Sequence, residues 1–201
     1  MRTEALSAAD LEGLLISTGA LKRGHFVLSS GLHSPTYVQC ALLLQDPKLA
    51  RKVGKALARR LAPLRPESVL APALGGLIIG HEVAAALGVP FRFTERQDGV
   101  MKLRRSFELQ AGERVAVVED AITTGKSTKE TIAVAEAAGA AVTAVGSIVD
   151  RTSGAPFEVP FFSLIRLQIP TYDPASGEPR PEWWGVPEKP GSRPQREGFD
   201  R

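Results

Sequence analysis

The fold of this chain is decided by the stretch Val115-Ala116-Val117-Val118-Glu119-Asp120-Ala121-Ile122-Thr123-Thr124-Gly125-Lys126-Ser127-Thr128. Its first four residues form a short apolar run without alternation, which is typical of a strand buried on both faces. Two adjacent acids follow, and then small, hydroxyl and glycine residues lead into a helical pattern from about Ser127 to Ala138. The stretch therefore predicts a strand over 115–118, a loop over 119–127 and a helix.

The loop predicted after this strand offers two kinds of chemistry. The first backbone N–H groups of a helix have no intrahelical partner, so the helix start is a ready anion site. Glu119 and Asp120 suit hydroxyl groups or a ligand bridged by magnesium. The simpler interpretation is an ordinary turn with two solvated acids and Lys126 pointing into solvent. A Walker motif is excluded, because Asp120 stands where that motif needs its first glycine.

Strand and helix patterns alternate on both sides of this stretch. Strands are predicted over 26–28, 37–39, 68–71, 90–94, 115–118, 141–149 and 161–167, and helices over 8–18, 47–61, 77–87 and 127–138. Such alternation predicts an α/β fold with a parallel sheet covered on both faces. Ligands of these sheets bind beyond the carboxyl ends of the strands, where loops 72–76, 119–127 and 150–154 are expected.

Two segments lack this regularity. Residues 95–107 are polar and basic, so we expect a mobile loop or a loose hairpin there, with Gly99 as a hinge. The chain from Tyr172 onward is rich in proline, glycine and charge, and we expect it to be irregular. We therefore predict one domain over residues 1–175 and an irregular tail over 176–201.

Composition narrows the class of protein. The chain has 201 residues, of which 43% are hydrophobic and 23% charged, as in ordinary globular domains. A net charge of +3 fits a small anionic substrate better than nucleic acid, and the cluster 102–105 is too short to argue for DNA or RNA. Cys40 is the single cysteine, so a reducing cytoplasm is expected and Cys40 is interpreted as a buried apolar residue. We expect neither a signal peptide nor a membrane-spanning segment.

The segment 119–127 resembles the phosphoribosyl-diphosphate (PRPP) signature of the type I phosphoribosyltransferases. The resemblance implies that Glu119 and Asp120 contact the ribose hydroxyls. It also implies that the loop after them wraps the 5′-phosphate. The PRPP-binding segment is then Glu119, Asp120, Ala121, Ile122, Thr123, Thr124, Gly125, Lys126 and Ser127. This signature does not specify the base.

Other segments point to the base. Residues 25–37 resemble the N-terminal signature of the orotate phosphoribosyltransferases, as do Arg151 directly after Asp150 and the stretch 169–174. The resemblance covers roughly residues 10 to 175. It implies that Arg151, Thr123 and Tyr37 bind orotate, and a guanidinium can pair a carboxylate through two hydrogen bonds. It also implies a central parallel sheet flanked by helices, a small hood from about 1–40 plus part of the C-terminal region, and a flexible lid loop.

The resemblance also implies a reaction. Orotate and PRPP would give orotidine 5′-monophosphate and diphosphate, in the biosynthesis of UMP. The lid, here 95–107, would bring Arg96 and Lys102 to the diphosphate, often from the neighbouring subunit of a homodimer. Magnesium would be the cofactor, without direct protein ligands, because this ion keeps several waters and substrate oxygens. Nucleic acid and membrane are not expected as partners.

The chain departs from this pattern at four positions. Ser29 and Gly75 stand where well-known relatives carry lysine, and Gln97 and Val100 where relatives carry basic residues. Two alternatives therefore stay open. A purine or xanthine phosphoribosyltransferase would share 119–127 but should lack the 26–37 signature. A regulator that senses PRPP without turnover would fit the missing lysines, but it would usually add a nucleic-acid-binding segment.

Overall fold

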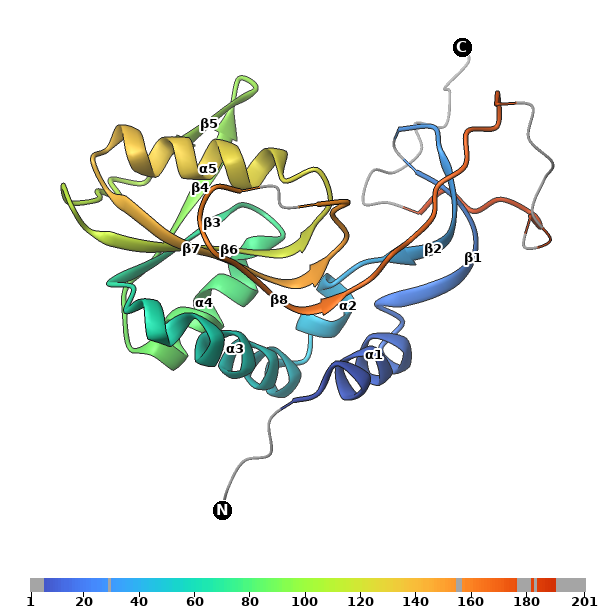
Figure 1. The fold of residues 1–201 in the computed structure, drawn as a ribbon, viewed down its shortest axis with the longest axis horizontal. Coiled ribbons are helices and arrows are strands. Elements are labelled where there is room, and N and C mark those ends of the chain that lie inside the picture. The colour runs from blue at the N-terminus through green and yellow to red at the C-terminus, as the bar shows by residue number, and fades with distance from the viewer. Residues whose placement is uncertain (1–5, 29, 155–156, 177–181, 183, 191–201) are drawn as a thin grey trace, which may run out of the picture. The chain divides into compact units, whose positions relative to one another are not determined.

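The computed structural model describes residues 6–28, 30–154, 157–176, 182 and 184–190 (Figure 1). The chain divides into two compact units. The first contains the chain up to Ala20 together with Gln39–Gln168, and the second contains Leu21–Val38 and the chain from Ile169. No helix in the described ranges is both long enough and apolar enough to cross a membrane.

A six-stranded sheet forms the centre of the first unit, in the order β5-β4-β3-β6-β7-β8. Its strands are β3 (Ser68–Pro72), β4 (Phe91–Gln97), β5 (Val100–Leu103), β6 (Arg114–Ile122), β7 (Ala141–Asp150) and β8 (Phe161–Arg166). Neighbouring strands are parallel except for β4 and β5, which pair antiparallel. The predicted parallel sheet is confirmed, and an antiparallel strand is added at its edge.

Helices cover both faces of this sheet. The helices of the first unit are α1 (Ala8–Ser17), α2 (Ala41–Leu44), α3 (Pro47–Leu61), the 3₁₀ turn η1 (Ala62–Leu64), α4 (Gly76–Leu87) and α5 (Lys126–Ala137). Helix α5 covers one face, whereas α3 and α4 lie on the other and pack against each other (Figure 1). The two-sided cover explains the apolar strand patterns, because Val115, Val117 and Val118 are fully buried in β6.

Local signals fix the ends of these helices. The side chain of Asp46 caps α3 by accepting a hydrogen bond from the N–H of Lys48 at 2.8 Å, and Pro47 follows as the first helical residue. The Ser7 hydroxyl caps α1 by accepting from the N–H of Asp10, and the Asp10 carboxylate accepts in turn from the N–H of Ser7. Gly88 ends α4 with φ of +73°. The predicted caps are confirmed, whereas the one-turn helix α2 was not predicted.

The irregular segment 95–107 begins as an ordered hairpin. Strand β4 continues to Gln97, which pairs with Val100, the first residue of β5. Asp98 and Gly99 form the turn with φ of +53° and +82°. Two successive positive φ angles are the geometry of a type I′ turn, for which Asp-Gly is a favoured pair. The hairpin alternative is therefore confirmed over the part that reaches Leu103.

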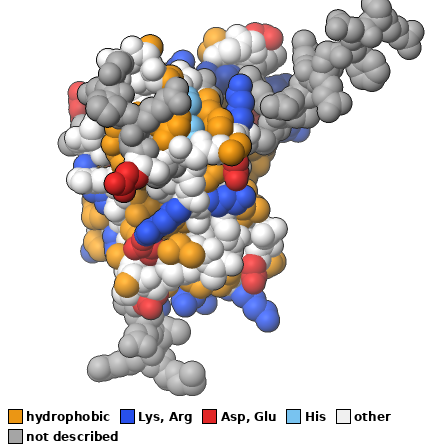
Figure 2. Space-filling view, turned by 90° about the vertical axis from the view of Figure 1, so that its right-hand side faces the viewer, with side chains coloured by type: hydrophobic (Ala, Val, Ile, Leu, Met, Phe, Trp, Pro, Cys, Tyr) orange, Lys and Arg blue, Asp and Glu red, His pale blue; other side chains and the backbone are white. Residues whose placement is uncertain are grey.

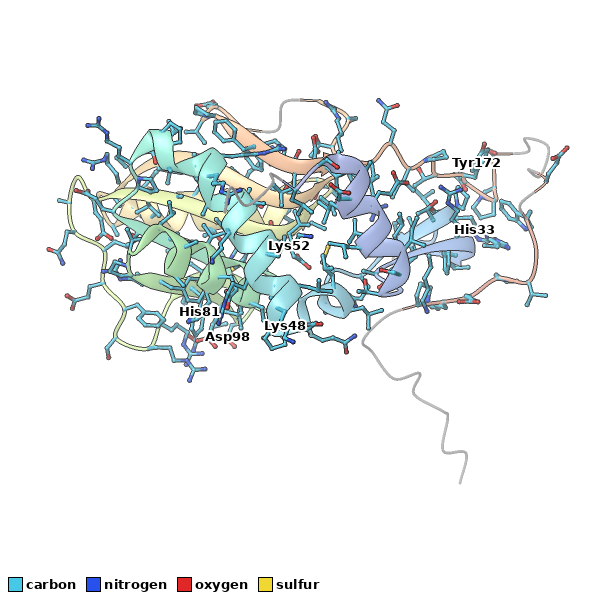
Figure 3. All side chains as sticks on the ribbon, turned by 90° about the horizontal axis from the view of Figure 1, so that it is seen from below. His33, Lys48, Lys52, His81, Asp98 and Tyr172 are labelled. Carbon is cyan, nitrogen blue, oxygen red and sulfur yellow. The ribbon has the colours of Figure 1, made fainter. Side chains whose placement is uncertain are left out.

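The second unit joins the hairpin of β1 (Leu21–Val27) and β2 (His33–Val38) to the C-terminal segment. His33 and Tyr172 lie side by side and exchange two backbone hydrogen bonds of 2.8 Å (Figure 3). The ring of Trp184 stacks on His33 with centroids 4.5 Å apart. In Figure 2, the visible histidine side-chain atoms are bordered by hydrophobic side chains. The strands are longer than predicted, and Tyr172 and Trp184 pack against the hairpin. Ser29 and Trp183 lie outside the described residues.

Candidate active site at the carboxyl end of the sheet

Strand β6 extends further than the sequence predicts, and both acids lie within it, near its carboxyl end. Its pairing with β7 continues from Glu119, opposite Ser147, to Ile122, opposite Asp150. The expectation that 119–122 belong to a loop is therefore wrong, because ladder hydrogen bonds to β7 keep these residues extended. Glu119 and Asp120 thus project from a fixed sheet edge, and the loop itself is limited to 123–125.

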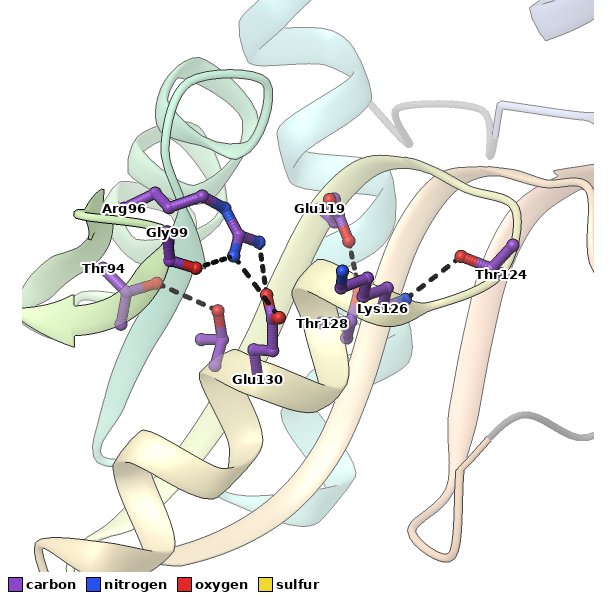
Figure 4. A network of polar contacts seen from close by, with 9 residues as sticks. Thr94, Arg96, Gly99, Glu119, Thr124, Lys126, Thr128 and Glu130 are labelled. Carbon is purple, nitrogen blue, oxygen red and sulfur yellow. Dashed lines mark hydrogen bonds and ion pairs between the residues drawn. The ribbon is translucent and has the colours of Figure 1, made fainter. Parts of the chain in front are cut away.

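Glu119 is anchored by the helix that follows it. The hydroxyl of Thr128, in the first turn of α5, donates a hydrogen bond to Oε2 of Glu119 (Figure 4). Burial raises the pKa of Glu119 to about 7, the Thr128 hydrogen bond opposes this rise, and the charge of Asp120 adds to it. Near neutral pH this carboxyl can therefore exist in both protonation states.

Asp120 lies against the loop between β3 and α4. Its Oδ1 accepts a hydrogen bond of 2.9 Å from the N–H of Ala121, and burial raises its pKa. A Cβ added to Gly75 would lie 2.6 Å from this same oxygen. Glycine at 75, where the resemblance predicts lysine, thus lets the loop backbone approach the carboxylate closely. Any side chain at this position would have to displace Asp120.

The segment that enters α5 has the geometry of an anion site. Thr123 and Thr124 are exposed, and Gly125 takes φ of +71° immediately before the helix. The N–H of Lys126 donates to the hydroxyl of Thr124 at 3.4 Å (Figure 4). The next N–H groups point out of the helix end without intrahelical acceptors. An anion placed here would meet backbone donors and the positive end of the helix dipole.

Arg151 follows β7 and is tied to the end of β6. Its N–H donates a hydrogen bond of 2.8 Å to the carbonyl of Ile122. Asp150 shapes the turn beyond it, because Oδ1 accepts from the N–H of Thr152 at 2.7 Å and Oδ2 lies 3.5 Å from Nε of Arg166. The predicted base-binding arginine is therefore fixed, through its backbone, beside the strand that carries the acids.

Cys40 lies beside the backbone of Asp120. It is 1% exposed, and its Sγ lies 3.8 Å from the carbonyl oxygen of Asp120. Burial raises the pKa of the Cys40 thiol, with the charge of Asp120 adding to the rise and that of Arg151 opposing it. The interpretation of Cys40 as a buried apolar residue is confirmed. Its place under the site was missed, because no local signal connects residue 40 with residues 120 and 151.

The two predicted lid cations are in different environments. Arg96 forms an ion pair with Glu130 of α5, and its Nη1 also donates to the carbonyl of Gly99 at 2.7 Å (Figure 4). Lys102 lies on β5 with an exposed side chain. Thr94 and Thr131 add a buried hydroxyl pair at 2.9 Å between β4 and α5. Arg96 therefore serves here as an anchor between the hairpin and α5.

Tyr37 belongs to the second unit, whereas the other predicted site residues belong to the first. Its ring packs against Phe26, with centroids 5.8 Å apart. Its contact with a base stays a prediction. Among the described residues, no group of three or more His, Cys, Asp or Glu side chains could hold a metal ion.

Comparison with known sequences gives a consistent result. The chain is 49% identical over 185 residues to an orotate phosphoribosyltransferase of Thermotoga maritima, which covers 91% of this chain and 98% of that protein. It is 48% identical over 179 residues to an orotate phosphoribosyltransferase of Rhizorhabdus wittichii, at 87% and 90% coverage. A search against protein-family models finds no match.

Comparison with solved structures supports the fold. The orotate phosphoribosyltransferase of Aeropyrum pernix is 28% identical, with a TM-score of 0.66 over 78% of this chain and 93% of that one. An adenine phosphoribosyltransferase of Trypanosoma brucei, at 18% identity, still reaches a TM-score of 0.58 over 76% and 79% of the two chains. The fold is thus shared by enzymes that act on different bases. The sequence relatives, which are orotate phosphoribosyltransferases, distinguish between these enzymes.

Replacing Glu119 by glutamine should flatten the dependence of stability on pH between 5 and 8. The pKa of Glu119 is about 7 in the folded protein against 4.5 for a free glutamate carboxyl, so folding favours its protonated form. The resulting stabilisation is complete below pH 4.5 and is lost as pH rises through 7. This difference corresponds to about 3 kcal/mol. Denaturant unfolding across this range measures it, and equal pH slopes in both proteins would contradict the assignment.

Proposed function

The chain belongs to the orotate phosphoribosyltransferase family, and from this membership we propose that it transfers the 5-phosphoribosyl group of PRPP to orotate. The products are orotidine 5′-monophosphate and diphosphate, in pyrimidine biosynthesis. The observation that carries the proposal is the hydrogen bond from the N–H of Arg151 to the carbonyl of Ile122, which ties Arg151 to the carboxyl end of the strand that carries Asp120. It supports a site in which Asp120 binds the sugar and Arg151 binds a carboxylate.

PRPP is bound by the strand end and the helix start. Glu119 and Asp120 accept hydrogen bonds from the ribose hydroxyls, because ionised carboxylates are hydrogen-bond acceptors and both are held in β6. The 5′-phosphate lies at Thr123–Ser127, where backbone N–H groups and hydroxyls donate to its oxygens. Ala121 and Ile122 contribute backbone, because they are held in β6 between the two groups.

Orotate is bound by a cation beside the same strand. The guanidinium of Arg151 pairs with the orotate carboxylate, and the planar fork suits a planar carboxylate. The hydroxyl of Thr123 supplies a further contact to the base, and Tyr37 flanks the ring. The second unit, which holds Tyr37, takes the part of the hood expected from residues 1–40 and the C-terminal region.

The chemistry is a displacement at C1 of the ribose. The bond from orotate N1 to C1 forms as the bond from C1 to the diphosphate oxygen breaks. Positive charge develops on the ribose in an oxocarbenium-like transition state. Orotate arrives as an anion, so the protein needs no strong general base. Its residues chiefly position two anions and place carboxylates near the developing charge.

Cations are needed at the leaving group. Mg²⁺ bound with PRPP would supply positive charge to the diphosphate. The exposed Lys102 adds a cation from the hairpin, and Arg96 would have to exchange Glu130 for diphosphate oxygens to do the same. Closure of the hairpin excludes water, which would otherwise hydrolyse PRPP.

The assembly proposed for this enzyme is a homodimer in the cytoplasm, with the lid of one subunit closing on its neighbour. Two exposed apolar side chains, Leu74 at 83% in the loop before α4 and Ile78 at 46% in the first turn of α4, support a subunit contact beside the site. The single cysteine fits a reducing compartment. The proposal includes no contact with nucleic acid or membrane.

An assay with orotate, PRPP and magnesium tests the reaction. We expect release of diphosphate with formation of orotidine 5′-monophosphate, and loss of turnover when a chelator removes the metal. Release with adenine, guanine or xanthine but not with orotate would favour the purine enzyme. Tight binding of PRPP without turnover of any base would favour the regulator.

Separate replacements should divide the two substrates. Arg151→Ala should raise KM for orotate by about 10- to 100-fold, because a charge-assisted hydrogen bond contributes roughly 1.5–3 kcal/mol. Asp120→Asn should chiefly raise KM for PRPP, since it removes a carboxylate that accepts ribose hydroxyls. Steady-state kinetics with each substrate varied in turn measures both effects. If both variants changed both KM values equally, this division of roles would be wrong.

Mixing two impaired variants tests the shared lid. Lys102→Ala should lose turnover through the lid, and Asp120→Asn through the PRPP site. In a hybrid dimer, the intact lid of one subunit would close over the intact site of the other. With random reassociation, about a quarter of the wild-type activity per subunit should return. No recovery in a mixture shown to contain hybrids would place the lid over its own subunit's site.

A further inference from the structure

We propose that Thr128 is a positioning residue for this reaction, whose buried hydroxyl fixes the Glu119 carboxylate in the orientation that accepts the ribose hydroxyls of PRPP. The inference rests on the proposed function and adds to it. Thr128 lies just beyond the segment 119–127 that carries the binding residues. Its side chain is fully buried, so it has no direct access to a ligand from solvent.

The hydrogen bond joins two rigid elements. Thr128 stands in the first turn of α5, and Glu119 stands in β6 opposite Ser147 of β7. The Thr128 hydroxyl donates to Oε2 of Glu119 across the start of the helix (Figure 4). One carboxylate oxygen is thereby held by the protein, and Oε1 is left to accept hydrogen bonds from a ligand. A side chain held at both ends loses little freedom when the ligand binds.

The charges around Glu119 make this bond important. Asp120, its neighbour on β6, disfavours a second negative charge, and burial acts in the same direction. Ser147, opposite on β7, is uncharged, and the charge of Lys126 on α5 acts on Glu130, which Arg96 also pairs. The Thr128 hydrogen bond is the interaction that lowers the pKa of Glu119. It therefore favours the ionised form, which accepts hydrogen bonds at both oxygens.

The same helix provides a matched control. Thr131 lies three residues further on and is as fully buried as Thr128. Its hydroxyl also forms a hydrogen bond with a partner outside the helix. That partner is Thr94 of β4, at 2.9 Å, and not an acid of the site. Thr128→Val and Thr131→Val thus remove equivalent buried hydroxyls from one helix. A merely structural effect should appear in both.

The test compares Thr128→Val, Thr128→Ser and Thr131→Val in the full-length protein. Thr128→Val should raise KM for PRPP by about 10-fold or more, with a smaller change in KM for orotate, because a hydrogen bond to a charged group is lost. Thr128→Ser keeps the hydroxyl and should stay within about threefold of the wild type. Thr131→Val should keep the wild-type KM for PRPP.

The pH profile separates positioning from general damage. Since ionised Glu119 is the better acceptor, kcat/KM for PRPP should rise with pH as Glu119 loses its proton. Without the Thr128 donor, this rise should move to higher pH, whereas Thr131→Val and Thr128→Ser should leave it in place. In a Glu119→Gln background, which has no such ionisation, adding Thr128→Val should cause no further loss.

Clear outcomes would overturn the inference. These are an unchanged KM for PRPP in Thr128→Val, an equal loss in Thr131→Val, or a pH profile that does not move. Should Thr128→Val not fold, Thr128→Ala removes the same hydroxyl with less bulk and repeats the comparison. Calorimetric binding of PRPP without orotate keeps the two proposals distinguishable. Weaker binding by Thr128→Val alone supports positioning even if orotate is not the acceptor, and equal binding by all four proteins refutes it.

Discussion

The backbone pairing between β6 and β7 is the constraint on which the site depends. It continues to Ile122 and Asp150, and the N–H of Arg151 then donates to the carbonyl of Ile122. The same few backbone hydrogen bonds therefore hold the strand ends that carry the acids and the arginine. Because parallel strands end at the same edge, residues 120 and 151 lie at that edge although they are 31 positions apart in the chain.

Burial then sets the chemical character of that edge. The neighbouring carboxyl groups of Glu119 and Asp120 both have raised pKa values, chiefly because burial removes water from the charged forms. Two nearby donors oppose this effect by hydrogen-bonding the carboxylates, namely the hydroxyl of Thr128 and the N–H of Ala121. A ligand with hydroxyl donors can give these oxygens the hydrogen bonds that water no longer gives them. Helix α5 takes part twice, since Thr128 reaches the acid and Glu130 reaches Arg96 of the hairpin.

Much of the fold follows from local patterns, and the exceptions have physical reasons. Buried strands and capped helices were predicted near their observed positions, because apolar runs and residues such as Asp46 and Gly88 act locally. The extension of β6 over 119–122 was missed, since only pairing with β7 keeps two adjacent acids extended. The Asp98-Gly99 turn was a readable signal of the hairpin. The pairing of His33 with Tyr172 had none, because the partners are distant in sequence.

By itself the sequence determined the α/β class and, by resemblance, the family, and it predicts a sugar-phosphate segment at 119–127. These depend on residues that are neighbours in the chain or lie at fixed spacings. Tertiary structure alone decided that Cys40 lies under Asp120, that Gly75 admits its carboxylate, and that Arg96 is engaged by Glu130. It also decided that Thr128 anchors Glu119. These contacts form where a strand end, a loop and a helix start converge, and no local pattern encodes the distance between side chains from separate elements.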